Sequence, residues 1–73
     1  MIIKFSRHAR RRMRLYDISE ETIHDLIGDI RKLGKHVIIK KIAGFDYPLK
    51  LIYDVQMNFI TVITVYPLKR GYK

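Results

Sequence analysis

The stretch that decides the fold is Leu49-Lys-Leu-Ile-Tyr-Asp-Val55, Gln56-Met-Asn58, Phe59-Ile-Thr-Val-Ile-Thr-Val-Tyr66. It consists of two runs of β-branched and aromatic residues joined by a short polar break, and this pattern predicts a β-hairpin. Side chains alternate along a strand, so the first run has one apolar face and one mixed face. The apolar face carries Leu49, Leu51, Tyr53 and Val55, and the mixed face carries Lys50, Ile52 and Asp54.

The second run of the hairpin is apolar on both faces, which favours an interior strand. Strict alternation places Phe59, Thr61, Ile63 and Val65 on one face and Ile60, Val62, Thr64 and Tyr66 on the other. An isolated hairpin is only marginally stable in water, so the residues that precede it are expected to cover it.

A first helix is predicted from residue 7 to 16, after a short strand or extended lead-in at residues 2–5. Ser6 is a suitable N-cap for this helix. The 3.6-residue period gives the helix a narrow apolar stripe and an opposite charged face. The stripe is Ala9, Met13 and Tyr16, the charged face is Arg7, Arg10, Arg11 and Arg14, and His8 and Arg12 lie at the border.

A second helix is predicted to begin after Ser19, because two glutamates follow this N-cap in the first turn. Gly34 fits the position just after its end. The core-facing residues of this helix are predicted to be Ile23, Leu26, Ile27, Ile30 and Leu33. Residues 36–42 predict another strand. The chain is therefore expected to form a single α+β domain over residues 1–73, with both helices packed on one face of a three- or four-stranded antiparallel sheet.

Positive charge is the strongest signal in the composition. The 73 residues carry a formal net charge of +8, and residues 1–14 hold one lysine and five arginines without any acid. Arginines in the first turn of a helix are unfavourable for the helix dipole, so helix stability does not explain them. A surface this basic attracts a phosphate polymer or an acidic protein.

Several protein classes become less favoured. There is no cysteine, which excludes disulfides and thiolate chemistry, and the three histidines show no metal-ligand spacing, so we expect neither a metal nor a cofactor. No stretch approaches the roughly 20 apolar residues of a membrane helix, which indicates a cytoplasmic protein without membrane contact. Asparagine and glutamine occur once each, a balance typical of proteins from hot environments. The small core makes a homodimer plausible.

Four segments resemble a family of small prokaryotic domains with the pattern HAxxRM…ISxxxI…LxVxY…VxTVYP. They are His8-Ala-Arg-Arg-Arg-Met13, Ile18-Ser-Glu-Glu-Thr-Ile23, Leu49-Lys-Leu-Ile-Tyr53 and Val62-Ile-Thr-Val-Tyr-Pro67. That family is similar to the RelE/ParE/BrnT superfamily of toxin–antitoxin toxins. The resemblance implies a RelE-like fold, an antitoxin protein as partner, and RNA, including ribosome-bound mRNA, as the target of a metal-independent endoribonuclease.

The resemblance also suggests site residues. Lys50 stands where the RelE pattern has an arginine, and Lys69-Arg70-Gly-Tyr72 lies where its closing basic-tyrosine segment would be. Lysine cannot make the bidentate hydrogen bonds that arginine makes to phosphate, so this chain can have lost cleavage activity. In metal-free cleavage, Lys50, Arg70 and Arg12 would stabilise phosphate charge, and His8 or Tyr72 would transfer protons. These residues are expected to share one hollow.

The residues predicted to bind nucleic acid without chemistry are Arg7, Arg10, Arg11, Arg14, Lys40, Lys69 and Tyr66. Tyr53 or Tyr66 would offer a stacking surface for a base. Structural alternatives remain open at this point: Arg12 can pair with an acid of the second helix, and Tyr53 can belong to the core. The alternative function is a non-catalytic domain that binds nucleic acid or an acidic protein.

Overall fold

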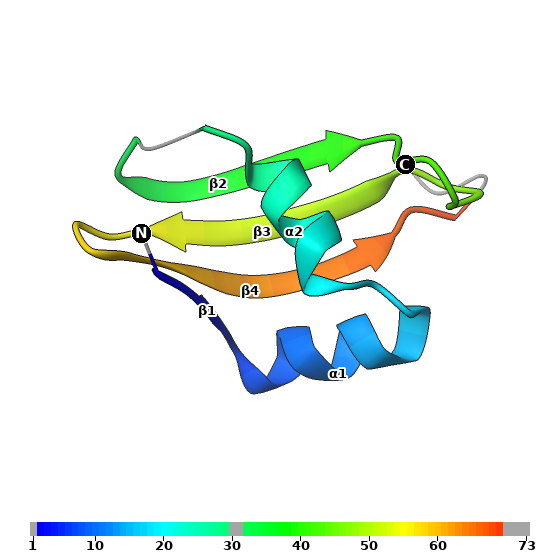
Figure 1. Ribbon diagram of the computed structural model, residues 1–73, viewed down its shortest axis with the longest axis horizontal. Coiled ribbons are helices and arrows are strands. Elements are labelled where there is room, and N and C mark those ends of the chain that lie inside the picture. The colour runs from blue at the N-terminus through cyan, green and yellow to red at the C-terminus, as the bar shows by residue number, and fades with distance from the viewer. Residues whose placement is uncertain (1, 30–31, 70–73) are drawn as a thin grey trace.

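The computed structural model describes residues 2–29 and 32–69. These residues form an α+β fold with two helices and one four-stranded sheet (Figure 1). The elements follow in the order β1 (Ile2–Phe5), α1 (Arg7–Tyr16), α2 (Glu20–Ile27), β2 (Gly34–Lys40), β3 (Leu49–Val55) and β4 (Phe59–Pro67).

The sheet has the strand order β1-β4-β3-β2, so β4 is an interior strand as predicted. Strands β2, β3 and β4 are antiparallel neighbours, whereas β1 pairs with β4 in parallel. The expectation of a wholly antiparallel sheet was therefore wrong. The chain reaches β4 from β1 only after both helices and two further strands, and such a long connection permits a parallel pair.

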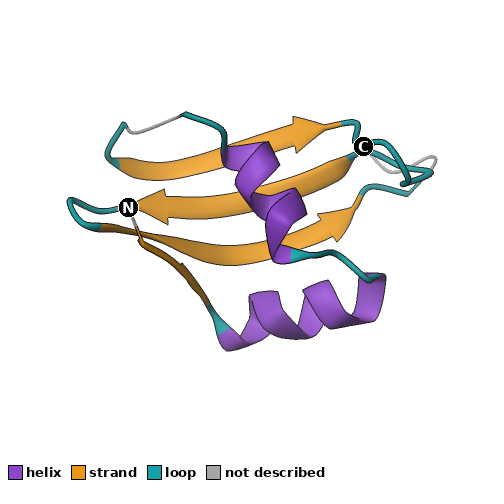
Figure 2. Cartoon of the chain, in the orientation of Figure 1, coloured by secondary structure: helices purple, strands orange, loops and turns teal. Residues whose placement is uncertain are grey.

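Both helices contribute side chains to the core that buries the apolar face of the hairpin. Helix α2 crosses the face of the sheet, and α1 runs beside β4, continuing from the end of β1 (Figure 2). The predicted apolar face of β3 is almost completely buried, with no side chain more than 1% exposed. The core consists of Ala9, Met13, Ile18, Ile23, Leu26, Ile27, Leu49, Leu51, Tyr53, Val55, Ile60, Val62 and Val65.

A β-bulge interrupts the predicted alternation of β4. Tyr53 pairs with Val62 and Ile52 pairs with Thr64, so Ile63 is an extra residue without a partner on β3. Beyond the bulge Val65 joins the core and Thr64 does not, which contradicts the strict alternation expected from the sequence.

Ser6 ties α1 to this bulge. Its hydroxyl accepts a hydrogen bond from the backbone N–H of Ala9 (2.9 Å), as expected of an N-cap, and donates one to the carbonyl of Ile63 (2.7 Å). The backbone N–H of Ser6 donates to the carbonyl of Val62 (3.0 Å). The cap that begins α1 therefore also fixes where the helix starts beside β4.

The predicted end of the second helix was wrong. Helix α2 stops at Ile27, and Gly28 follows as its C-cap with φ 59°, a conformation that favours glycine. Gly34 instead begins β2, two residues before the predicted strand, and the Leu33 side chain is 61% exposed. Ile30, also predicted in the core, lies outside the described residues.

Candidate nucleic-acid interface

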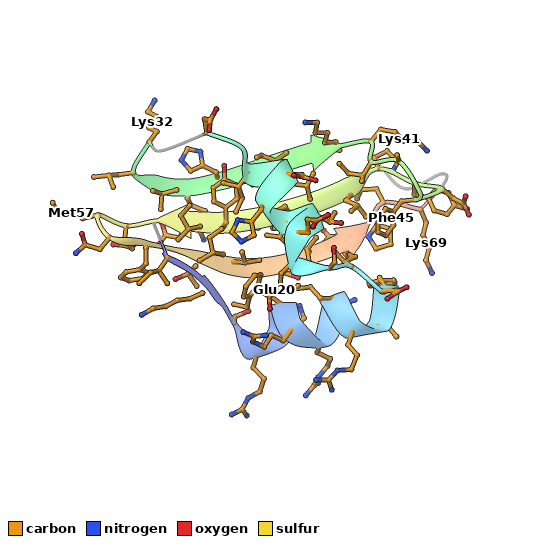
Figure 3. All side chains as sticks on the ribbon, in the orientation of Figure 1. Glu20, Lys32, Lys41, Phe45, Met57 and Lys69 are labelled. Atoms are coloured by element: carbon orange, nitrogen blue, oxygen red, sulfur yellow. The ribbon has the colours of Figure 1, made fainter. Side chains whose placement is uncertain are left out.

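The cationic hollow is a depression of about 400 Å³ lined by Arg12, Tyr16, Tyr66, Pro67 and Lys69. Its residues come from α1, from the end of β4 and from the segment just after β4. Figure 3 places Lys69 at the end of the molecule opposite Met57, which lies in the turn of the hairpin. The hollow therefore forms where the last strand leaves the sheet beside the C-terminal end of α1.

Helix α1 supplies a cation and an aromatic ring one turn apart. Residues four apart lie on the same side of a helix, and Nη1 of Arg12 donates a long hydrogen bond of 3.5 Å to the Tyr16 hydroxyl. The sequence placed Tyr16 only in the apolar stripe. The side chain does pack partly against the core, but it also lines the hollow.

Strand β4 supplies Tyr66, which faces away from the core and pairs with Lys50 on β3. The Lys50 Nζ lies 6.0 Å from the centroid of the Tyr66 ring, within the range of a cation–π contact. Lys50 does not line the hollow itself. Its ammonium group nevertheless lies beside Tyr66, which does line the hollow, so two residues that were predicted separately are neighbours in the structure.

The charges of the cationic hollow are not neutralised within the described part of the chain. No carboxylate lies within ion-pairing distance of Arg12 or Lys69 among residues 2–29 and 32–69. The ion pair to α2 is instead made by Arg10, whose Nη1 lies 3.7 Å from Oε2 of Glu20. Both side chains of that pair are more than half exposed, so its contribution to stability is small.

The other predicted arginines of α1 line a separate depression, here called the arginine groove, formed by Phe5, Arg7, Arg10, Arg11 and Arg14. The guanidinium carbon of Arg10 lies 5.0 Å from the centroid of the Phe5 ring. The structure thus divides the basic residues of α1 between two surfaces, and Arg12 is the arginine that faces the aromatic hollow.

Some predicted site residues lie elsewhere. His8 is exposed one turn before Arg12 and does not line the cationic hollow. Lys40 lies opposite Leu49 in the strand register, so its side chain is on the other face of the sheet from Lys50. Arg70 and Tyr72 lie outside the described residues.

Tyr53 is a core residue and offers no stacking surface for a base. Its side chain is fully buried, and its ring stacks on His36 with centroids 5.2 Å apart. Its hydroxyl has no hydrogen-bond partner among the described residues. Burial raises the pKa of the Tyr53 hydroxyl above its usual value.

Comparison with known proteins returned no matching family model, no matching curated protein and no matching solved structure. Within residues 2–29 and 32–69 there is no group of three or more histidine, aspartate or glutamate side chains that could hold a metal ion. None of the helices in this part of the chain is long and apolar enough to cross a membrane.

Proposed function

We propose that this protein binds single-stranded RNA in the cationic hollow, as a toxin-like domain that an antitoxin protein neutralises. The observation that carries the proposal is the presence of Arg12 and Lys69 in one hollow with Tyr16 and Tyr66. Guanidinium and ammonium groups bind phosphates, and aromatic rings stack on bases that are not paired.

The geometry favours a single strand over a duplex. The hollow, at about 400 Å³, has the size of a site for a small molecule or a single nucleotide, whereas a duplex presents phosphates across an extended surface. Base stacking on Tyr16 or Tyr66 requires a base that is splayed out, which is how loops and single strands of RNA are recognised. The net charge of +8 adds long-range attraction for the polyanion.

Metal-independent RNA cleavage is the second part of the proposal. RNA supplies its own nucleophile, the ribose 2′-hydroxyl, so the protein has to stabilise charge on the phosphate and move protons. Arg12, Lys69 and the neighbouring Lys50 would stabilise the charge. The candidate for proton transfer is the hydroxyl of Tyr16, which lines the hollow and accepts a hydrogen bond from Arg12.

RNA binding is tested with a fluorescently labelled ten-nucleotide RNA and fluorescence anisotropy across a range of salt concentrations. We expect Arg12→Ala and Lys69→Ala each to weaken binding about tenfold, and each to reduce the slope of log K against log salt by about 0.7. Lys35→Ala is the matched control. Lys35 lies opposite Asp54 in the register of β2 and β3, near the hairpin end of the sheet and far from the hollow. A wild-type protein that binds no RNA would refute the proposed function.

Cleavage is tested separately by expressing the protein alone and sequencing the cellular mRNA. We expect growth arrest and new 5′ ends with the wild type, and neither with Arg12→Ala or Lys50→Ala. RNA that is bound but left intact would remove the enzymatic part and favour a non-catalytic nucleic-acid-binding domain. The arginine groove supports that alternative, because it combines four arginines with a single lining aromatic residue, Phe5.

A further inference from the structure

A second depression, here called the acidic hollow, adjoins the cationic hollow. It has a volume of about 300 Å³, and Tyr16 and Pro67 line both depressions. Its other lining residues differ in character, since they include two aspartates and two further aromatic residues. These are Asp17, Asp46, Phe45 and Tyr47.

The wall formed by Asp17 is set by the end of α1. Asp17 has φ 56°, and the backbone N–H of Ile18 donates to the carbonyl of Met13 (2.8 Å), which is the hydrogen bond of a Schellman motif. The carboxylate is therefore attached to a fixed helix terminus, immediately after the Tyr16 ring that the two hollows share.

The opposite wall is the connection between β2 and β3, and its backbone is held at three points. Nζ of Lys41 donates to the carbonyl of Asp46 (2.8 Å), and the N–H of Phe45 donates to the carbonyl of Ile42 (3.2 Å). The N–H of Leu68 donates to the carbonyl of Pro48 (2.8 Å), which ties this connection to the segment carrying Lys69. Figure 3 shows Phe45 and Lys69 at the same end of the molecule.

The chemistry of the acidic hollow selects its ligand. Carboxylates repel phosphate and accept hydrogen bonds from N–H groups, while aromatic rings bind planar groups by stacking. A base with N–H donors on its Watson–Crick edge meets both requirements. Guanine fits best because its N1–H and N2–H are adjacent and parallel, so they match the two oxygens of a carboxylate as a guanidinium group does.

The other bases fit less well. Adenine and cytosine each present an amino group beside a ring nitrogen that is an acceptor, and uracil presents one N–H between two carbonyl groups. A carboxylate would meet an acceptor in each of these bases, which is unfavourable. We infer that the acidic hollow is a guanine subsite, next to a cationic hollow that holds the phosphate. This inference rests on the proposed RNA binding and adds a base preference to it.

The test uses four labelled nine-nucleotide RNAs that are uridine throughout except at the central position, which is G, A, C or U. We expect the wild type to bind the G-containing RNA at least tenfold more tightly than the all-uridine RNA. Asp17→Asn and Asp46→Asn should bring that ratio to within twofold while binding to the all-uridine RNA is retained. Asparagine is nearly isosteric and tolerates the backbone conformation of Asp17, so both variants should fold.

A wild type that binds all four RNAs equally would overturn the guanine subsite and leave the proposed RNA binding intact, as would variants that keep the full preference. If the wild type binds none of the RNAs, the proposed function fails, and free guanosine then tests the acidic hollow alone. Guanosine should shift the NMR signals of the Gly44 and Asp46 amides, whereas uridine should not. Signals that stay unmoved by guanosine would overturn the subsite.

Discussion

Removing the Ser6 hydroxyl should destabilise the protein more than removing an ordinary helix cap. The hydroxyl accepts from the N–H of Ala9 and also donates to the carbonyl of Ile63 in the bulge of β4. Ser19 provides the matched comparison, because its hydroxyl caps α2 by accepting from the N–H of Thr22 (3.1 Å). Its second hydrogen bond, to the Thr22 hydroxyl (3.0 Å), stays within the same exposed helix turn. Ser6→Ala therefore removes a link between helix and sheet that Ser19→Ala leaves in place.

The expected magnitude follows from these contacts. Loss of an N-cap costs about 1 kcal/mol, and loss of the partly buried bond to Ile63 costs about 1 kcal/mol more. For a domain of 73 residues the total free energy of unfolding is about 4 to 11 kcal/mol. Ser6→Ala should therefore lower Tm by about 8 to 16 °C, and Ser19→Ala by about half as much.

Urea unfolding followed by circular dichroism measures both variants under the same conditions. The free energies of unfolding should differ by about 1 kcal/mol, with m-values unchanged. Equal losses in the two variants would show that the Ser6–Ile63 hydrogen bond contributes nothing. The position of α1 beside β4, on which the cationic hollow depends, would then need another explanation.

Two further predictions concern single residues. Asp17→Gly should raise the free energy of unfolding by about 1 kcal/mol, because Asp17 has φ 56° and glycine adopts this conformation without strain. Urea unfolding measures this change, and a destabilised variant would contradict the prediction. Tyr53→Phe should leave the free energy of unfolding at pH 7 unchanged or raise it by about 1 kcal/mol, because the buried hydroxyl has no hydrogen-bond partner in the described part of the chain. The raised pKa of Tyr53 means that the folded state favours the neutral phenol, so wild-type stability should fall as pH rises above the usual value of 10.0. Because phenylalanine does not ionise, the stability of Tyr53→Phe should fall less than that of the wild type over this pH range. If Tm falls equally for both proteins from pH 8 to 11, the raised pKa of Tyr53 is refuted.

Local signals in the sequence predicted the parts of the fold that depend on neighbouring residues. The alternation of β3 identified its buried face, and Ser6 marked the start of α1 correctly. The end of α2 also had a local signal, Gly28, but the apolar period continued to Leu33 and suggested a longer helix. Periodicity alone therefore misplaced a boundary that the glycine conformation sets.

Features that depend on distant segments were not predictable in the same way. The bulge at Ile63 is bound to Ser6, which is 57 residues away in the sequence. The candidate site likewise combines α1 with the end of β4. The hollow predicted around Arg12 included Lys50 and His8, which do not line it, whereas Tyr66 and Lys69 do. Tyr16 was missed as a site residue because its position in the helical period already assigned it to the core.

We propose that the cationic hollow, and not basic charge in general, binds RNA. A comparison of Arg12→Ala with Arg11→Ala tests this most directly, because each substitution removes one arginine from α1. Arg12 lines the cationic hollow, whereas Arg11 lines the arginine groove. In anisotropy titrations with a single-stranded RNA, we predict about tenfold weaker binding for Arg12→Ala and less than twofold for Arg11→Ala. Equal losses for the two variants would contradict the account.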